Sequence, residues 1–126
     1  MMDIEITGIR SDGGIFRLKE RSGTLTRLLI KDERLVSIDL SPLVNCEKLT
    51  HIELDNNQLT AIDLSPLSEI DSLTQLWLGN NNLSSIDLSP LRSTPLSTLI
   101  LDSNSLNAFK LYNLPFRMYS SFWYFP

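Results

Sequence analysis

Residues 73–83 read LTQLWLGNNNL, a spacing of leucines and one asparagine that can be written L-x-x-L-x-L-x-x-N-x-L. The same frame recurs at residues 49–59, with isoleucine at its second leucine position, and at residues 96–106, so successive copies start 24 and 23 residues apart. A more distant copy at residues 25–35 is apolar at every required position but has Glu33 in place of the asparagine. Such a constant period predicts a repeat protein in which each unit buries its apolar side against its neighbours.

Within the frame, apolar residues alternate with other residues at positions 52/54, 76/78 and 99/101, which is the period of a short strand with one buried face. We expect these strands to stack in parallel at the usual spacing of about 4.8 Å. Asn57, Asn81 and Asn104 fall where the chain leaves each strand, and we interpret them as a structural ladder whose buried amides satisfy backbone groups of the loops. This register predicts that Asn81→Ala costs more stability than Asn80→Ala.

A second block, IDLSPL, occurs at residues 38–43, 62–67 and 86–91. In each copy a serine precedes a proline, the pair typical of an N-cap followed by the first helical residue. The block predicts short helices on the side of the molecule opposite the strands. We expect them to run through about Leu43 to Glu47, Leu67 to Asp71 and Leu91 to Ser93.

The strand frame resembles the highly conserved segment of the leucine-rich repeat family, and the resemblance covers about residues 25–114. It implies an α/β fold: a right-handed curved solenoid with a parallel sheet on its concave side and short helices or turns on its convex side. Members of this family mostly bind other proteins. We expect one domain over residues 1–126, with an N-terminal cap (1–24), four repeats (25–48, 49–72, 73–95 and 96–114) and a C-terminal cap (115–126).

The N-terminal segment admits two descriptions. Residues 4–6 and 15–19 are strand-like and flank a turn at residues 11–14, which predicts a β-hairpin cap. Residues 1, 4 and 6 also lie 24 residues before apolar positions of the first frame, so a degenerate extra repeat is the alternative. Glu33 fits an end repeat whose loop faces a cap instead of another repeat.

The C-terminal segment is rich in aromatic side chains, with eight of the ten aromatic residues at or after Phe109. We favour a cap that covers the open core of the last repeat, because the ends of a solenoid must be covered. The alternatives are an uncovered patch that forms a homodimer contact or docking surface, and a chain that is a fragment of a longer repeat array.

Side chains that point out of the predicted concave face fall into three columns. The central column is Leu29, Glu53, Trp77 and Ile100; the flanking columns are Arg27, His51, Gln75 and Thr98, and Lys31, Asp55, Gly79 and Asp102. An outward tryptophan is the type of anchor that dominates binding energy at protein interfaces. We predict a binding surface made of Trp77, Glu53, Ile100, His51, Gln75, Arg27 and Asp55; the alternative is that Trp77 is covered and only packs.

Charge and cysteine content narrow the class of partner. Residues 35–108 carry two basic and nine acidic side chains, which favours a basic protein or peptide partner, or simply keeps the surface soluble. The acidic balance disfavours a nucleic-acid partner, and the sequence contains no apolar run long enough for a membrane span. A single cysteine, Cys46, allows no internal disulfide, and Met1 to Glu5 lack the pattern of a secretory signal, so we expect a cytoplasmic location.

No residue set predicts catalysis, a metal or a cofactor. Asp39, Asp63 and Asp87 form an acidic series, but its spacing is unlike that of known calcium repeats, and we expect these side chains to face solvent or accept hydrogen bonds from amides ahead of each serine-proline pair. His51, Glu53 and Asp55 share one face but offer a single imidazole on an open surface. We expect Cys46 to be a small core residue.

The sequence therefore predicts a non-catalytic protein-interaction module that binds a protein or peptide on its concave face, as a signalling or cytoskeletal adaptor. The alternative is a structural protein that self-assembles through its aromatic C-terminal segment.

Overall fold

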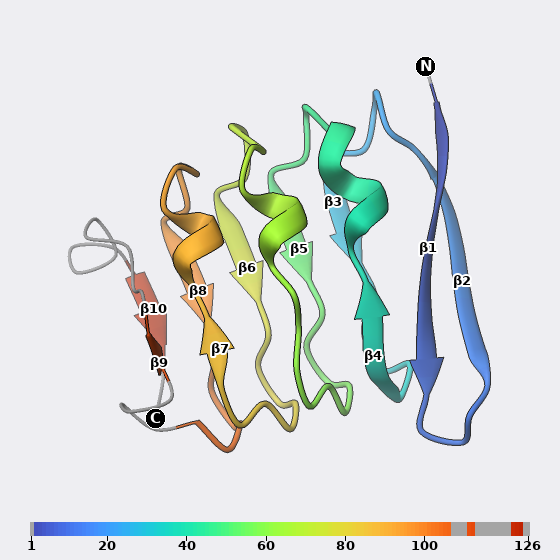
Figure 1. Ribbon diagram of the computed structural model, residues 1–126, viewed down its shortest axis with the longest axis vertical. Helices are drawn as coiled ribbons and strands as arrows, with labels where there is room; N and C mark the ends of the chain where they lie inside the picture. Colours follow the sequence, from blue (N-terminus) through green and yellow to red (C-terminus); the bar gives the residue numbers. More distant parts are fainter. Residues whose placement is uncertain (1, 107–110, 113–121, 125–126) are drawn as a thin grey trace.

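The computed structural model describes residues 2–106, 111–112 and 122–124 (Figure 1). Ten strands and three short 3-10 helices follow one another along these residues. In chain order they are β1 (Asp3–Arg10), β2 (Ile15–Arg21), β3 (Arg27–Leu29), β4 (Leu35–Asp39), η1 (Ser41–Asn45), β5 (His51–Glu53), η2 (Ser65–Leu67), β6 (Gln75–Trp77), β7 (Ile86–Asp87), η3 (Ser89–Leu91), β8 (Thr98–Ile100), β9 (Leu111–Tyr112) and β10 (Phe122–Tyr124).

One strand from each copy of the frame enters a parallel five-stranded sheet, whose order is β10-β8-β6-β5-β3. The four strands that belong to the frame pair in register, so that Leu28, Ile52, Leu76 and Leu99 lie side by side. Figure 1 shows this sheet on one side of the molecule and the 3-10 helices on the other. The predicted solenoid of parallel strands is thus the observed architecture.

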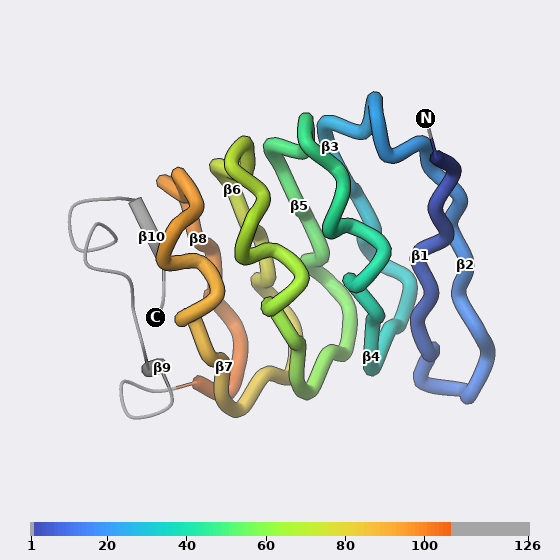
Figure 2. The backbone as a smooth tube through the Cα atoms, turned by 45° about the horizontal axis from the view of Figure 1, so that its top comes forward, coloured from blue at the N-terminus to red at the C-terminus, as the bar shows by residue number. Residues whose placement is uncertain are grey.

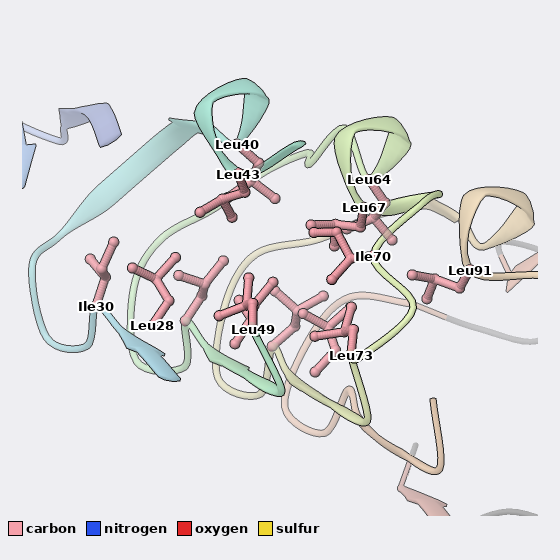
Figure 3. Close-up of a cluster of buried hydrophobic side chains, with 14 of the residues drawn as sticks. Leu28, Ile30, Leu40, Leu43, Leu49, Leu64, Leu67, Ile70, Leu73 and Leu91 are labelled. Carbon is pink, nitrogen blue, oxygen red and sulfur yellow. The ribbon is translucent and has the colours of Figure 1, made fainter. Parts of the chain in front are cut away.

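The core fills the space between these two layers with leucine and isoleucine side chains (Figure 3). The middle residue of each of the four strands is fully buried, and each such side chain contributes about 1.5–3 kcal/mol relative to exposure. From the opposite layer, Leu43, Leu67 and Leu91 of the 3-10 helices are equally buried. Because each repeat meets its neighbours through these side chains, no repeat completes a core alone.

The serine-proline blocks form helices, but not with the predicted cap. Each is a 3-10 helix that begins at the serine itself, and Leu40, Leu64 and Leu88 occupy the N-cap positions without a side-chain cap hydrogen bond. These leucines have helix-like backbone angles near φ −90° and ψ 0°, whereas a capping serine needs extended geometry. The serine amide is instead satisfied by the aspartate two residues earlier, through bonds of 2.9–3.0 Å. Asp39, Asp63 and Asp87 are therefore acceptors, as predicted, but the donor is the amide of the serine itself and not an amide ahead of the serine-proline pair.

The first two strands form an antiparallel hairpin, and β1 also pairs antiparallel with β4 (Figure 2). Since β1 lies outside the parallel sheet, the alternative of a degenerate extra repeat at its N-terminal end is wrong. Ile4, Ile6 and Phe16 of the hairpin belong to the same buried cluster as the repeat leucines. Glu33, the residue that replaces the ladder asparagine, pairs with Arg10 of β1 at 2.7 Å, so this first loop does face the hairpin.

Asparagine side chains link each loop to the preceding one. Asn81 Oδ1 accepts from the Leu59 amide at 3.0 Å, and its Nδ2 donates to the carbonyl oxygens of Leu54 and Leu78 at 3.2 and 3.0 Å. Asn57 and Asn104 make the equivalent bonds in their own loops. Each amide thus satisfies backbone groups that the tight loops leave without partners.

At the C-terminal end, β10 pairs in parallel with β8 and β9 with β7. The structure describes only the backbone of these two strands. The predicted roles of the aromatic side chains, as a cap or as an association surface, therefore lie outside the described residues.

Candidate binding site

The seven predicted binding residues lie on one surface of the parallel sheet. We call it the sheet face and define it by the outward residues of the frame, Arg27, Leu29, Lys31, His51, Glu53, Asp55, Gln75, Trp77, Gly79, Thr98, Ile100 and Asp102. Strand pairing sets the first two columns side by side, from Arg27 to Thr98 and from Leu29 to Ile100. Beyond the strands, the amide of Asn56 donates to the Gly79 carbonyl at 3.1 Å and that of Asn80 to the Asp102 carbonyl at 2.8 Å, so the third column is in register as well.

Trp77 lies in the middle of this surface and is partly buried. Its indole Nε1 donates a hydrogen bond of 3.0 Å to Oε1 of Gln75, which precedes it by two residues on the same face. The neighbours of Trp77 in the same column, Glu53 and Ile100, are also partly buried. A tryptophan held in this way loses little freedom when a partner packs on its ring.

Charges at the β3 end of the sheet face are paired. Arg27 contacts Glu53 at 2.9 Å and Lys31 contacts Asp55 at 3.4 Å. The basic side chains are largely exposed, so each pair contributes at most about 1 kcal/mol. His51 Nδ1 lies 2.8 Å from the Thr50 hydroxyl. This end of the surface is therefore close to neutral.

A hollow lies on the part of the sheet face that runs from β5 to β8, between Asp55 and Asp102. Its volume is about 180 Å³, and its lining is Asp55, Asn56, Trp77, Gly79, Asn80, Ile100 and Asp102. That volume is below the range of about 300–1,000 Å³ typical of small-molecule pockets, and it suits a single side chain.

The two carboxylates of the hollow differ in what they offer a ligand. Asp55 is paired with Lys31 through Oδ2, and its Oδ1, the one buried side-chain atom without a hydrogen-bond partner in the described part of the chain, is closed to solvent. The Asp102 carboxylate makes no hydrogen bond or ion pair with any residue that the structure describes. The hollow is thus suited to a donor with positive charge.

Gly79 makes the hollow possible. Its φ angle is not positive, so the backbone does not require glycine here. A Cβ atom at this position would collide with Oδ1 of Asp102. Glycine therefore provides space for the Asp102 carboxylate beside Trp77.

Sequence reasoning placed Asp55 in the binding set but left out Asn56, Gly79, Asn80 and Asp102. The signal for two of them was present in the third column, where a glycine stands between two aspartates. Asn56 and Asn80 follow that column and have positive φ angles of 61° and 55°, with a 2.7 Å bond between their side chains. Their contribution to the hollow depends on these loop conformations, which no spacing of leucines encodes.

The described residues form no site for a metal ion, and the cysteine and the aspartate series have structural surroundings. Among the described residues, no group of three or more histidine, cysteine, aspartate or glutamate side chains is placed to hold a metal ion. Cys46 is fully buried, as expected for a core residue, and burial raises the pKa of its thiol. Hydrogen bonds from Ser41, first of all from its backbone amide, lower the pKa of Asp39. In the same described ranges, no helix has the length and apolar character to cross a membrane.

Comparison with known proteins identifies the repeat. The leucine rich repeat family model matches residues 23–83. A solved leucine-rich repeat protein of Leptospira interrogans is 24% identical, with a TM-score of 0.59 over 70% of this chain and 22% of that one. Internalin C2 of Listeria monocytogenes is 26% identical, with a TM-score of 0.49 over 70% of this chain and 37% of that one. The first likeness supports the fold, and this chain spans well under half the length of either solved protein. No curated protein sequence matches the chain significantly.

Proposed function

The chain belongs to the leucine-rich repeat family, and we propose that it binds a protein or peptide on its sheet face without catalysing a reaction. The family fold generally mediates protein–protein interaction. The observation that carries the proposal for this chain is Trp77, held by Gln75 at the centre of three in-register columns of outward side chains. Partly buried aromatic side chains surrounded by polar ones are the usual centres of binding energy.

Our proposal extends to the kind of partner. The excess of acidic side chains in residues 35–108 favours a basic protein or peptide by long-range attraction. We also propose that the chain acts as a signalling or cytoskeletal adaptor in the cytoplasm. For the fold, we propose that the solenoid is right-handed and that the hairpin caps its N-terminal end. Fractionation of cells that express the chain tests the proposed location.

Selection from a random peptide library displayed on phage tests the binding function. Peptides selected on the protein are then measured against Trp77→Ala and against Val44→Ala, a control variant that truncates an exposed side chain on η1. We expect Trp77→Ala to weaken binding by about thirtyfold, the equivalent of about 2 kcal/mol, and Val44→Ala to leave it unchanged. Selected peptides that bind equally well to Trp77→Ala would exclude the sheet face as the binding surface.

A second function, self-assembly through the aromatic C-terminal segment, is supported by the concentration of aromatic residues after Phe109. Under this function, association depends on the C-terminal segment and not on the sheet face. If it holds, Trp123→Ala makes the protein monomeric, while Trp77→Ala and Glu53→Lys leave every association intact.

A further inference from the structure

We propose that the hollow between Asp55 and Asp102 binds the guanidinium group of an arginine side chain in a partner peptide, with the arginine stem against Trp77. This inference rests on the proposed function, because it assumes that a peptide lies on the sheet face. It adds the residue that the surface selects and the atoms that select it.

The charges of the sheet face point to a cation at this place. At the β3 end, Arg27 and Lys31 neutralise their acidic neighbours, whereas the Asp102 carboxylate has no partner among the described residues. Asp55 is already paired with Lys31 through Oδ2, and its Oδ1 is closed to solvent, so the free acceptor in the hollow is the Asp102 carboxylate. A donor that enters the hollow would meet this carboxylate.

A free carboxylate beside an aromatic ring fits a guanidinium better than an ammonium. Asp55 and Asp102 lie two strands apart in one column, which separates their Cα atoms by roughly 10 Å, and the collision of a Gly79 Cβ with Oδ1 shows that the Asp102 carboxylate leans back toward β6. A guanidinium is planar and has five donors on its edges, so it can donate two parallel bonds to the Asp102 carboxylate while its face lies against the Trp77 ring. An ammonium is compact and strongly hydrated, and it has no flat surface to lay on an aromatic ring.

Trp77 and Gly79 complete this arrangement. Trp77 lines the hollow together with Ile100, so the aliphatic stem of an arginine has an apolar wall, and its guanidinium has an aromatic ring to stack on. Gly79 forms the floor between the two acids, where any side chain would displace the Asp102 carboxylate. The hollow thus offers a flat, charged group a carboxylate at its edge and an aromatic ring at its face.

The test titrates the full chain with N-acetyl-arginine amide and follows the NMR signals of the Trp77 indole N–H and the Gly79 amide. Titration with N-acetyl-lysine amide shows how well an ammonium binds in place of the guanidinium. Titration with N-acetyl-citrulline amide shows how well an uncharged group of nearly the same shape binds. We expect saturable shifts with the arginine amide, binding weaker by about tenfold with the lysine amide, and no saturation with the citrulline amide.

Two variants with the same change in charge locate the site. Asp102→Asn should weaken binding of the arginine amide by about tenfold or more, whereas Asp39→Asn, on β4 and away from the sheet face, should leave it unchanged. Gly79→Ala should weaken binding as well, since the new methyl group displaces the Asp102 carboxylate. Thermal melts check that Gly79→Ala folds, and the result for Asp102→Asn decides the question if it does not.

Several outcomes would overturn the assignment. One is the absence of saturable shifts with the arginine amide. Equal binding of the lysine or citrulline amide is another, and equal weakening by Asp39→Asn would indicate diffuse attraction instead of a site.

The peptides selected from the phage library separate this inference from the function on which it rests. If they need Trp77 but contain no arginine and ignore Asp102→Asn, the arginine site is wrong and the binding function stands. If the arginine amide binds as expected but no selected peptide depends on Trp77, the hollow is a site for arginine and the proposed peptide-binding surface fails.

Discussion

The asparagines at the ends of the strands show how much one side chain contributes to a repeat fold. Asn81 is 6% exposed and joins two loops. Its Oδ1 accepts one backbone hydrogen bond, and its Nδ2 donates to three backbone carbonyl oxygens. We expect Asn81→Ala to lower the free energy of unfolding by about 1–3 kcal/mol or more, because the Leu59 amide and the Leu54 and Leu78 carbonyl oxygens lose their partner while buried. Urea unfolding monitored by circular dichroism measures the change.

The control at the neighbouring residue must respect the backbone. Asn80 is exposed, but its φ angle is 55°, so alanine there adds about 1–2 kcal/mol of backbone strain and blurs the contrast expected from the sequence. Asn80→Gly removes the side chain without that strain, and we expect a loss below about 1 kcal/mol. Equal losses for Asn81→Ala and Asn80→Gly would contradict the role assigned to Asn81.

At the scale of the element, an ionised aspartate stabilises the turn that leads into η2. Hydrogen bonds from the hydroxyl and then the backbone amide of Ser65 lower the pKa of Asp63 below its ordinary value of 3.8. A carboxyl whose pKa is lower in the folded state stabilises the fold above its unfolded pKa, and this stabilisation disappears as the pH falls through the folded pKa.

Asp63→Asn therefore tests the turn by its pH dependence. The asparagine Oδ1 still accepts the Ser65 amide but does not titrate, so we expect stability somewhat below that of the wild type at neutral pH and a smaller loss between about pH 4 and pH 2. Glu69→Gln removes another exposed carboxylate outside the turn and serves as the control. Acid unfolding curves of Asp63→Asn that superimpose on the wild-type curve would exclude this contribution.

The same elements show what the sequence could and could not predict. Leucine spacing placed the four strands of the frame because burial of one face leaves a strict period in the sequence. The serine-proline pair predicted a short helix in each block correctly but placed its bounds and cap wrongly, because each helix ends by Asn45, Leu67 or Leu91. The propensity of serine for caps is overridden where the preceding leucine is already helical in φ and ψ. The hollow at Gly79 was missed because it depends on which way the Asp102 carboxylate leans, and that orientation leaves no periodic signal.

For the whole molecule, the central question is how the two ends of the solenoid are covered. An uncovered end exposes both apolar core and the unpaired edge of a sheet, and both promote association. At the N-terminal end, Ile4, Ile6 and Phe16 of the hairpin join the core cluster. At the other end, β10 extends the parallel sheet beyond β8, in a segment whose sequence supplies eight of the ten aromatic residues.

We predict that the chain is a monomer, because the hairpin joins the core cluster at one end and we expect the aromatic residues from Phe109 onward to cover the other. Light scattering coupled to gel filtration should give 14.3 kDa at every loading concentration. Trp123→Ala, within β10, should then lower stability without changing the mass. A mass that rises with concentration, and falls back to that of one chain in Trp123→Ala, would instead make the C-terminal segment an assembly contact, because only an intermolecular contact ties the mass of the particle to that side chain.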